Sequence, residues 1–185
     1  PQLNDFYQDH AVYMQAWSEI EKARYHHRRQ EFHSAEEHFE KSASIHRSLK
    51  PWSYLAPNYS AWAQVENAEE LSRKEKSEES LQAFERAARL FSDTKISIQA
   101  TLVKIEDLDE KQMATSMVKA TDLRREYCVG RISLEEAKIL DKKGDHSSSS
   151  EKYGSAAETF ERLSQTLESE QERREIKFIT CLTRA

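Results

Sequence analysis

Basic and imidazole side chains gather in one short stretch of the sequence, between Lys22 and His33. The stretch holds Arg24, His26, His27, Arg28, Arg29 and His33. Arginine offers a planar fork of N–H donors, so such a cluster could bind phosphate groups or an acidic peptide. A simpler interpretation is a solvated helix face, because Glu19, Glu31, Glu36 and Glu37 supply nearby negative charge. The sequence leaves both interpretations open, and we favour the balanced face.

The histidines raise the question of a metal site, and two of them, His33 and His38, lie beside Glu36 and Glu37. Two histidines on one helix converge on a metal ion when they are four residues apart, or three apart with a carboxylate. No pair of histidines in the sequence is four apart, and neither cysteine has a close partner. We therefore predict no metal site and no other cofactor.

One short catalytic pattern is present, because Arg28 and His33 form the ends of an Arg-x4-His motif. The motif resembles that of helical ribonucleases of the HEPN type, in which the histidine would move protons and the arginine would support phosphate charge. So short a match arises easily in a chain rich in arginine and histidine. A helical RNA- or nucleic-acid-binding module, or a HEPN-like ribonuclease using Arg28 and His33, is therefore kept as the alternative function.

The composition indicates that helices position these residues. The chain has 185 residues, enough for one domain, but only three glycines and three prolines. So few turn residues exclude a β-sandwich, and the abundant Ala, Glu, Lys, Arg, Gln and Leu favour helix. We predict an all-α fold of about eight helices. Its breaks are expected at Ser48–Asn58, Ser92–Asp93 and Lys143–Asp145, and one long helix is expected after Asp109.

The charge balance and the two cysteines help to indicate the class of protein and its cellular compartment. Charged residues of both signs make up 33% of the chain and leave a net charge of -5, which does not suit a broad electrostatic contact with DNA or RNA. Cys128 and Cys181 lie far apart in helical patterns, which fits buried thiols in a reducing compartment. The sequence has neither a long apolar run nor a signal-peptide layout. We predict a cytoplasmic protein with no membrane partner.

Three segments repeat one spacing of small and aromatic residues. Each starts with an alanine and continues with a turn residue seven positions later, a small residue at twelve, an aromatic at sixteen and a small residue at nineteen. The sets are Ala23, Gln30, Ala35, Phe39 and Ser42; Ala68, Glu75, Ser80, Phe84 and Ala87; and Ala137, Gly144, Ser149, Tyr153 and Ala156. Small residues let two helices approach closely while the aromatic fills the space between them. The spacing predicts hairpins near 16–47, 60–92 and 130–166, with extra helices near 94–127 and 169–185.

This spacing resembles the tetratricopeptide repeat (TPR), in degenerate form. The small positions Ala35 and Ser80 are 45 residues apart, and Ser80 and Ser149 are 69 apart, whereas the family period is about 34. The resemblance implies a single TPR-like domain over 1–185, a right-handed stack of antiparallel hairpins. Because Leu182–Ala185 look like the start of another repeat segment, we expect the sequence to belong to a longer protein.

The resemblance also implies a function, that of a non-enzymatic interaction scaffold or adaptor which binds a partner peptide or helix on its concave face. The partner-binding residues predicted on this template are Trp17, Ile20, Arg24, His27, Arg28, Trp62, Val65 and Arg73. Further template positions are Glu69, Ser72, Arg131, Leu134, Lys138, Asp141 and Lys142. Seven of these fifteen residues are basic, which favours an acidic protein or peptide rather than nucleic acid or a small-molecule substrate. Both tryptophans could anchor a peptide, although packing against a neighbouring helix is their commoner role.

Overall fold

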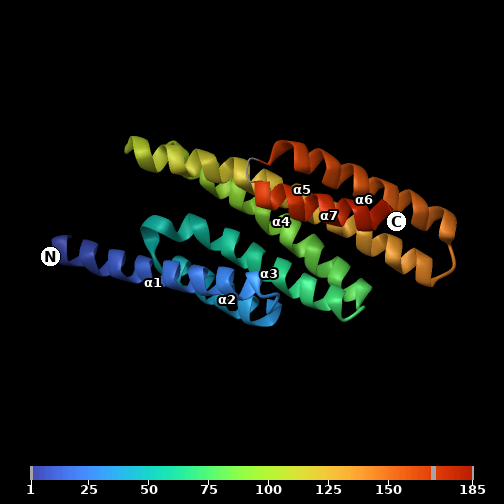
Figure 1. The fold of residues 1–185 in the computed structure, drawn as a ribbon. Coiled ribbons are helices and arrows are strands. Elements are labelled where there is room, and N and C mark those ends of the chain that lie inside the picture. The colour runs from blue at the N-terminus through green and yellow to red at the C-terminus, as the bar shows by residue number, and fades with distance from the viewer. Residues whose placement is uncertain (1, 168–169, 185) are drawn as a thin grey trace.

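The computed structural model describes the backbone of residues 2–167 and 170–184 and the side chains of 7–167, 170 and 173–184. All regular structure in this part of the chain is helical, which confirms the predicted all-α class (Figure 1). The α-helices are α1 (Gln2–Arg28), α2 (Phe32–Ser48), α3 (Ala56–Arg73), α4 (Ser77–Leu102), α5 (Leu108–Lys142), α6 (His146–Thr166) and α7 (Glu170–Arg184), and a short 3-10 helix, η1 (Lys50–Leu55), precedes α3.

The predicted count of about eight helices is wrong, since the described residues form seven α-helices. The expected break at Ser92–Asp93 is absent because α4 runs unbroken through it. The Ser92 hydroxyl donates to the Ala88 carbonyl at 3.1 Å, and the Thr94 hydroxyl donates to the Leu90 carbonyl at 2.8 Å. These side chains bond back into their own helix instead of capping a new one.

The predicted long helix is present as α5, which has 35 residues. It begins after Asp107, whose carboxylate accepts a hydrogen bond from the Glu110 backbone N–H at 2.8 Å. A carboxylate in this place satisfies an N–H group that has no partner within the helix. The residues expected to form a separate helix near 94–127 are therefore divided between the end of α4 and the first half of α5.

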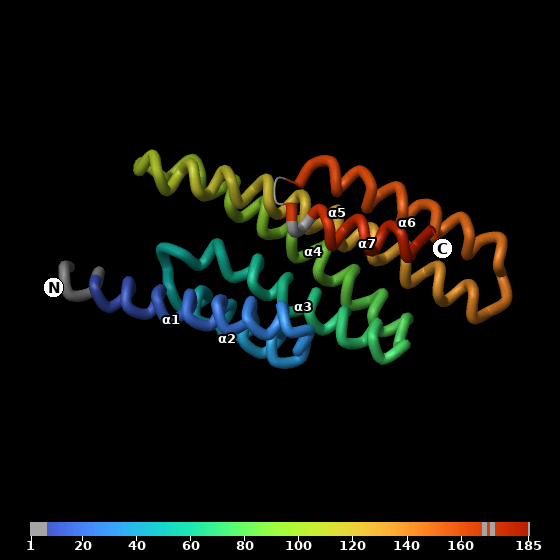
Figure 2. The backbone as a smooth tube through the Cα atoms, in the orientation of Figure 1, coloured from blue at the N-terminus to red at the C-terminus, as the bar shows by residue number. Residues whose placement is uncertain are grey.

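Each helix packs mainly against the helix that follows it in the chain. Figure 2 shows the backbone doubling back after α1, α3 and α5, which gives the pairs α1–α2, α3–α4 and α5–α6. The buried core follows this order. One cluster surrounds Phe39 and Tyr59, a second surrounds Phe84 and Phe91, and a third joins Phe160 to α7. The molecule is thus a row of hairpins with successive clusters of buried residues, rather than a domain built around one central core.

The turns of the three hairpins share one geometry. We number each repeat from its first alanine, so Ala23, Ala68 and Ala137 occupy position 0. The residues at position +7 all have positive φ, namely 58° at Gln30, 60° at Glu75 and 80° at Gly144. In each turn the N–H of the next residue bonds to the carbonyl five residues before it: Glu31 to His26 at 3.0 Å, Lys76 to Leu71 at 3.0 Å, and Asp145 to Leu140 at 3.1 Å. This bond and the left-handed residue define a Schellman motif.

The small residue at position +12 holds the two helices of a hairpin together. The Ser80 hydroxyl donates to the Ala68 carbonyl, and the Ser149 hydroxyl donates to the Ala137 carbonyl, each at 2.9 Å. Ala35 occupies the same position in the first hairpin and is fully buried. A larger side chain at this position would push the paired helices apart.

A second complementary pair of positions was not found in the sequence. Seven residues before position 0 lie Ala16, Ala61 and Gly130, and twenty-three residues after it lie the buried rings of His46, Phe91 and Phe160. A Cβ atom added to Gly130 would lie only 2.7 Å from the Phe160 ring. The small residue at position -7 therefore leaves room for the ring at position +23.

Candidate partner-binding surface

The first helices of successive hairpins are joined by polar contacts that also follow the repeat. Position +4 of one hairpin meets position -2 of the next. His27 Nδ1 lies 2.7 Å from Glu66 Oε1, and the Ser72 hydroxyl donates to Glu135 Oε1 at 2.6 Å. Both carboxylates are fully buried. A buried carboxylate needs such partners to offset its lost hydration.

A cation at position +5 reaches back to the turn of the preceding hairpin. Arg73 donates to the Gln30 carbonyl at 3.0 Å, and Lys142 donates to the Glu75 carbonyl at 3.0 Å. Both acceptors are the left-handed turn residues at position +7. Arg28 holds position +5 in the first hairpin, is exposed, and makes no ion pair or hydrogen bond with the described residues.

The densest polar network joins α3 to α5 around Arg131. Its guanidinium lies 2.7 Å from the Glu69 carboxylate and 4.8 Å from the centre of the Phe84 ring. The Tyr127 hydroxyl donates to Glu69 at 2.6 Å, and Lys138 donates to the Ser72 hydroxyl at 2.9 Å. Only 9% of the Arg131 side chain and 13% of the Glu69 side chain are exposed. The network links the second hairpin to the third, and little of its surface is exposed for a ligand to contact.

The predicted partner-binding residues divide into buried and accessible groups. Ile20 and Val65 are only 1% and 3% exposed, so both belong to the core and lie out of a partner's reach. They occupy position -3, which faces the second helix of the same hairpin. Trp62 is half-buried, stacks on Phe39 with ring centres 5.7 Å apart, and has the Arg124 guanidinium 5.2 Å from its ring.

The accessible group of predicted residues lies mainly on α1. Trp17 is half-buried, whereas Arg24, His27 and Arg28 are exposed, as is Arg73 on α3. The Arg24 guanidinium lies 5.9 Å from the centre of the Trp17 ring. These residues bring an aromatic surface and several N–H donors to one side of the first helix, which is a composition common at protein interfaces.

The positive charge predicted from the template is largely balanced by acids that the template does not include. Arg24 pairs with Glu21 at 2.6 Å, Lys138 pairs with Glu135 at 2.7 Å, and Arg73 pairs with Glu70. Most of these acids lie one helical turn from the cation on the same helix. The surface is therefore less positive than its fifteen template positions suggest.

The candidate catalytic pair is not assembled. His33 is 75% exposed, and its ring nitrogens lie 3.6 Å from Glu36 and 3.7 Å from Glu37. Among the described residues, no hydrogen bond or ion pair joins His33 to Arg28. The same part of the chain holds no group of three or more His, Cys, Asp or Glu side chains placed to bind one metal ion.

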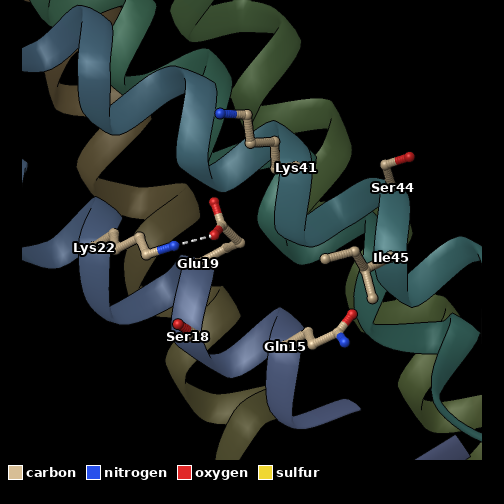
Figure 3. Close-up of a pocket in the computed structure, with 7 residues that line it drawn as sticks. All are labelled: Gln15, Ser18, Glu19, Lys22, Lys41, Ser44 and Ile45. Carbon is tan, nitrogen blue, oxygen red and sulfur yellow. Dashed lines mark hydrogen bonds and ion pairs between the residues drawn. The ribbon is translucent and has the colours of Figure 1, made fainter. Parts of the chain in front are cut away.

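A shallow polar hollow lies between α1 and α2 (Figure 3). Its lining consists of Gln15, Ser18, Glu19, Lys22, Lys41, Ser44 and Ile45. Lys22 donates to Glu19 at 2.5 Å across its wall, and the other Glu19 oxygen lies 2.7 Å from His38. Sequence reasoning missed the stacked rings of His26 and His38 nearby, because they lie on different helices.

No family model, curated protein or solved structure matches this chain. In the described residues, no helix combines the length and apolar character needed to cross a bilayer. Any assignment of function therefore rests on the geometry of the helices themselves.

The contact between His27 and Glu66 predicts a pH-dependent contribution to stability. The Glu66 carboxylate, 2.7 Å from the imidazole, raises the pKa of His27 above its ordinary value of 6.5, and Glu69 and Glu175 add to this effect. Because the folded pKa is the higher one, the stabilisation is complete below the unfolded pKa and is lost as pH rises through the folded pKa. We expect the stability difference between wild type and His27→Gln to be largest near about pH 6 and to shrink by about pH 9.

Urea unfolding at a series of pH values would measure this difference. His146→Gln is a suitable control, because His146 also lies beside a carboxylate but is 77% exposed. A His27→Gln difference that stays constant from pH 6 to pH 9, both approximate limits of the titration, would contradict the assigned ion pair.

Proposed function

We propose that the chain is a non-enzymatic, TPR-like interaction scaffold that binds a partner peptide or helix on the surface of its first helices. The observation that carries the proposal is the repetition of contacts. The three hairpins share the same turn, and the +4 to -2 and +5 to +7 contacts recur between successive hairpins. Repeated units with repeated interfaces are the structural basis of solenoids, whose extended surfaces bind other chains. The free cysteines fit the cytoplasm as its location.

The partner is expected to contact the α1 end of this surface most strongly. The polar side chains between α3 and α5 bond mainly to one another and are largely buried, whereas Arg28 is exposed and has no partner among the described residues. Arg28 is equivalent to Arg73 and Lys142, each of which donates to a carbonyl oxygen of a neighbouring turn. A partner that offers carboxylate or carbonyl oxygens to Arg28 would complete this pattern, and it could extend along α1 to Arg24 and the Trp17 ring.

The test compares two variants with the same change of charge. Arg24→Glu plus Arg28→Glu reverses the accessible α1 site, while Lys41→Glu plus Arg89→Glu reverses two exposed cations on the second helices α2 and α4. Each protein is immobilised on a resin and incubated with native extract, and the proteins that it retains are quantified by mass spectrometry. The site variant should retain a specific partner at least about tenfold less than wild type, and the control should retain it unchanged.

Equal losses in the two variants would mean that overall charge, rather than the α1 site, governs binding. Loss in the control alone would place the partner on the second helices. Either result would contradict the proposed surface.

A further inference from the structure

Two histidines of the first hairpin form a stacked pair between its helices. His26 lies on α1 and His38 on α2, and their ring centres are 5.3 Å apart with 12° between the ring planes. The side chains of His26 and His38 are 26% and 19% exposed, so solvent reaches both. The ligand spacings considered in the sequence join residues of one helix, so they do not cover a pair that only folding brings together.

Each imidazole of this pair contacts one carboxylate through its Nδ1 atom. His26 Nδ1 lies 2.6 Å from Glu31 Oε2, at the turn of the hairpin. His38 Nδ1 lies 2.7 Å from Glu19 Oε2, on the facing helix. Both rings are therefore held in place by a carboxylate, and in both rings the nitrogen that remains for another ligand is Nε2.

A cation keeps each of these carboxylates in its ionised form. Arg29 donates to Glu31 at 2.8 Å, and Lys22 donates to Glu19 at 2.5 Å, a contact drawn in Figure 3. The Arg29 guanidinium, with His26 beside it, holds the pKa of Glu31 below its ordinary value of 4.5. An ionised carboxylate only accepts hydrogen bonds, so Nδ1 of each neutral ring carries the proton. The lone pair of each neutral ring is therefore on Nε2.

The two Nε2 atoms are available to a ligand. Neither has a hydrogen-bond partner among the described residues, and neither belongs to the buried polar atoms that lack one. The separation of the rings suits a shared ion. An imidazole nitrogen binds zinc at about 2.0–2.1 Å with its ring centre about 1.1 Å farther away, which puts two histidines of one tetrahedral ion roughly 5 Å apart, centre to centre. The observed distance is 5.3 Å.

We propose that His26 and His38 bind one Zn²⁺ ion through their Nε2 atoms, while Glu31 and Glu19 accept hydrogen bonds from the Nδ1–H groups. Metal-bound histidines commonly donate their other N–H to a carboxylate, which fixes the tautomer and the orientation of the ring. No third His, Cys, Asp or Glu in the described part of the chain is placed to share the ion, so water completes its coordination. The site is separate from the proposed interaction surface and does not depend on it.

Isothermal titration calorimetry with Zn²⁺ tests the site on the full chain, prepared without a histidine tag and stripped of metal. We expect about one Zn²⁺ per chain. His26→Gln and His38→Gln should each weaken binding at least about tenfold, because a single imidazole is left to hold the ion. His33→Gln is the control. His33 also lies near carboxylates, those of Glu36 and Glu37, but it is 75% exposed and outside the pair, so its replacement should leave the affinity unchanged.

Two further measurements separate metal binding from a role in packing. Glu31→Ala keeps both imidazoles but removes the acceptor of His26 Nδ1–H, and it should weaken Zn²⁺ binding about tenfold. Zn²⁺ at about 100 times its Kd should lower the unfolding equilibrium constant of the wild type about a hundredfold. The same concentration should not change that constant in the double variant His26→Gln plus His38→Gln, because the variant has no imidazole at the site.

Electron paramagnetic resonance identifies the ligands directly. Cu²⁺ binds imidazole donors more tightly than Zn²⁺ does, and at this site its spectrum should show splitting from two imidazole nitrogens. Failure of the wild type to bind Zn²⁺ at about 1 mM would overturn the proposal. So would Zn²⁺ binding that survives His26→Gln plus His38→Gln, or binding that His33→Gln removes, because the ion would then lie elsewhere on the chain.

Discussion

Replacing Arg131 with methionine is expected to lower the free energy of unfolding by about 3–5 kcal/mol. The substitution keeps most of the side-chain volume but leaves the Glu69 and Glu135 carboxylates without the guanidinium that lies 2.7 Å and 3.6 Å from them. Glu135 would keep Lys138, whereas Glu69 would keep only the Tyr127 hydroxyl among the partners described above. Urea unfolding, followed by the helical circular dichroism signal at about 222 nm, would measure the decrease in the free energy of unfolding.

Two further proteins test whether the loss comes from an uncompensated charge. Arg125→Met removes an arginine that is 47% exposed on the same helix, and it should change stability by less than about 0.5 kcal/mol. Adding Glu69→Leu to Arg131→Met removes both charges and should recover much of the loss. If Arg131→Met alone were as stable as wild type, the network would not hold the hairpins together.

Gly130→Val is expected to destabilise the fold by about 2–3 kcal/mol, because the new side chain enters space occupied by the Phe160 ring. The added Cβ would lie 2.7 Å from one ring carbon and 2.9 Å from the next. Thermal unfolding should show this as a fall in the melting temperature of roughly 4–12 °C for a chain of this size.

Gly154→Val is the matched control, because Gly154 also lies within a helix but has no neighbouring atom within 4 Å of an added Cβ. Valine favours helix more than glycine does, so this control should be neutral or slightly stabilising. A double-mutant cycle with Phe160→Ala should show strong coupling to Gly130→Val, since both changes act on the same space. Equal effects of valine at the two glycine positions would show that α5 and α6 do not approach closely at Gly130.

The close packing of paired helices was the part of the fold most accessible from sequence, and the turn geometry was less so. The small residues Ala35, Ser80 and Ser149 lie where two helices touch, so their spacing reports the packing directly. Gln30 and Glu75 carry no such signal, because neither residue type favours the left-handed conformation that both adopt. Their positions became meaningful only in alignment with Gly144.

The matched positions -7 and +23 were missed because the residue types vary among the hairpins. His46 stands where the other hairpins have phenylalanine, and Gly130 stands where they have alanine. A search for aromatic residues passes over a histidine, although its buried ring stacks on Tyr59 at 4.9 Å. The three hairpins thus keep the shapes of the side chains at these two positions, whereas the chemical types of the residues differ.

The candidate site was predicted less well than the fold, because its charges pair across long stretches of sequence. The concave template included His27 and Arg131 but could not identify Glu66 as the partner of His27. Helical periodicity places side chains on a face of one helix, whereas the pairing depends on how neighbouring helices are set against each other. The excess of positive charge has a different origin, because the template counts only its own positions and leaves out acids three residues away on the same helix, such as Glu21 beside Arg24.

The neighbour-to-neighbour packing of the helices has a consequence for how the chain acquires its structure. Most contacts join segments close together in sequence, so little chain entropy is lost before each contact forms. Folding can begin at any hairpin and spread outward, and amide hydrogen exchange is expected to be slower in α2 to α6, which pack against a helix on both sides, than in α1 and α7. α1 and α7 each pack mainly against one neighbouring helix, so local unfolding is expected to begin there. A ligand bound to either helix would therefore raise the free energy of unfolding of the whole row of hairpins.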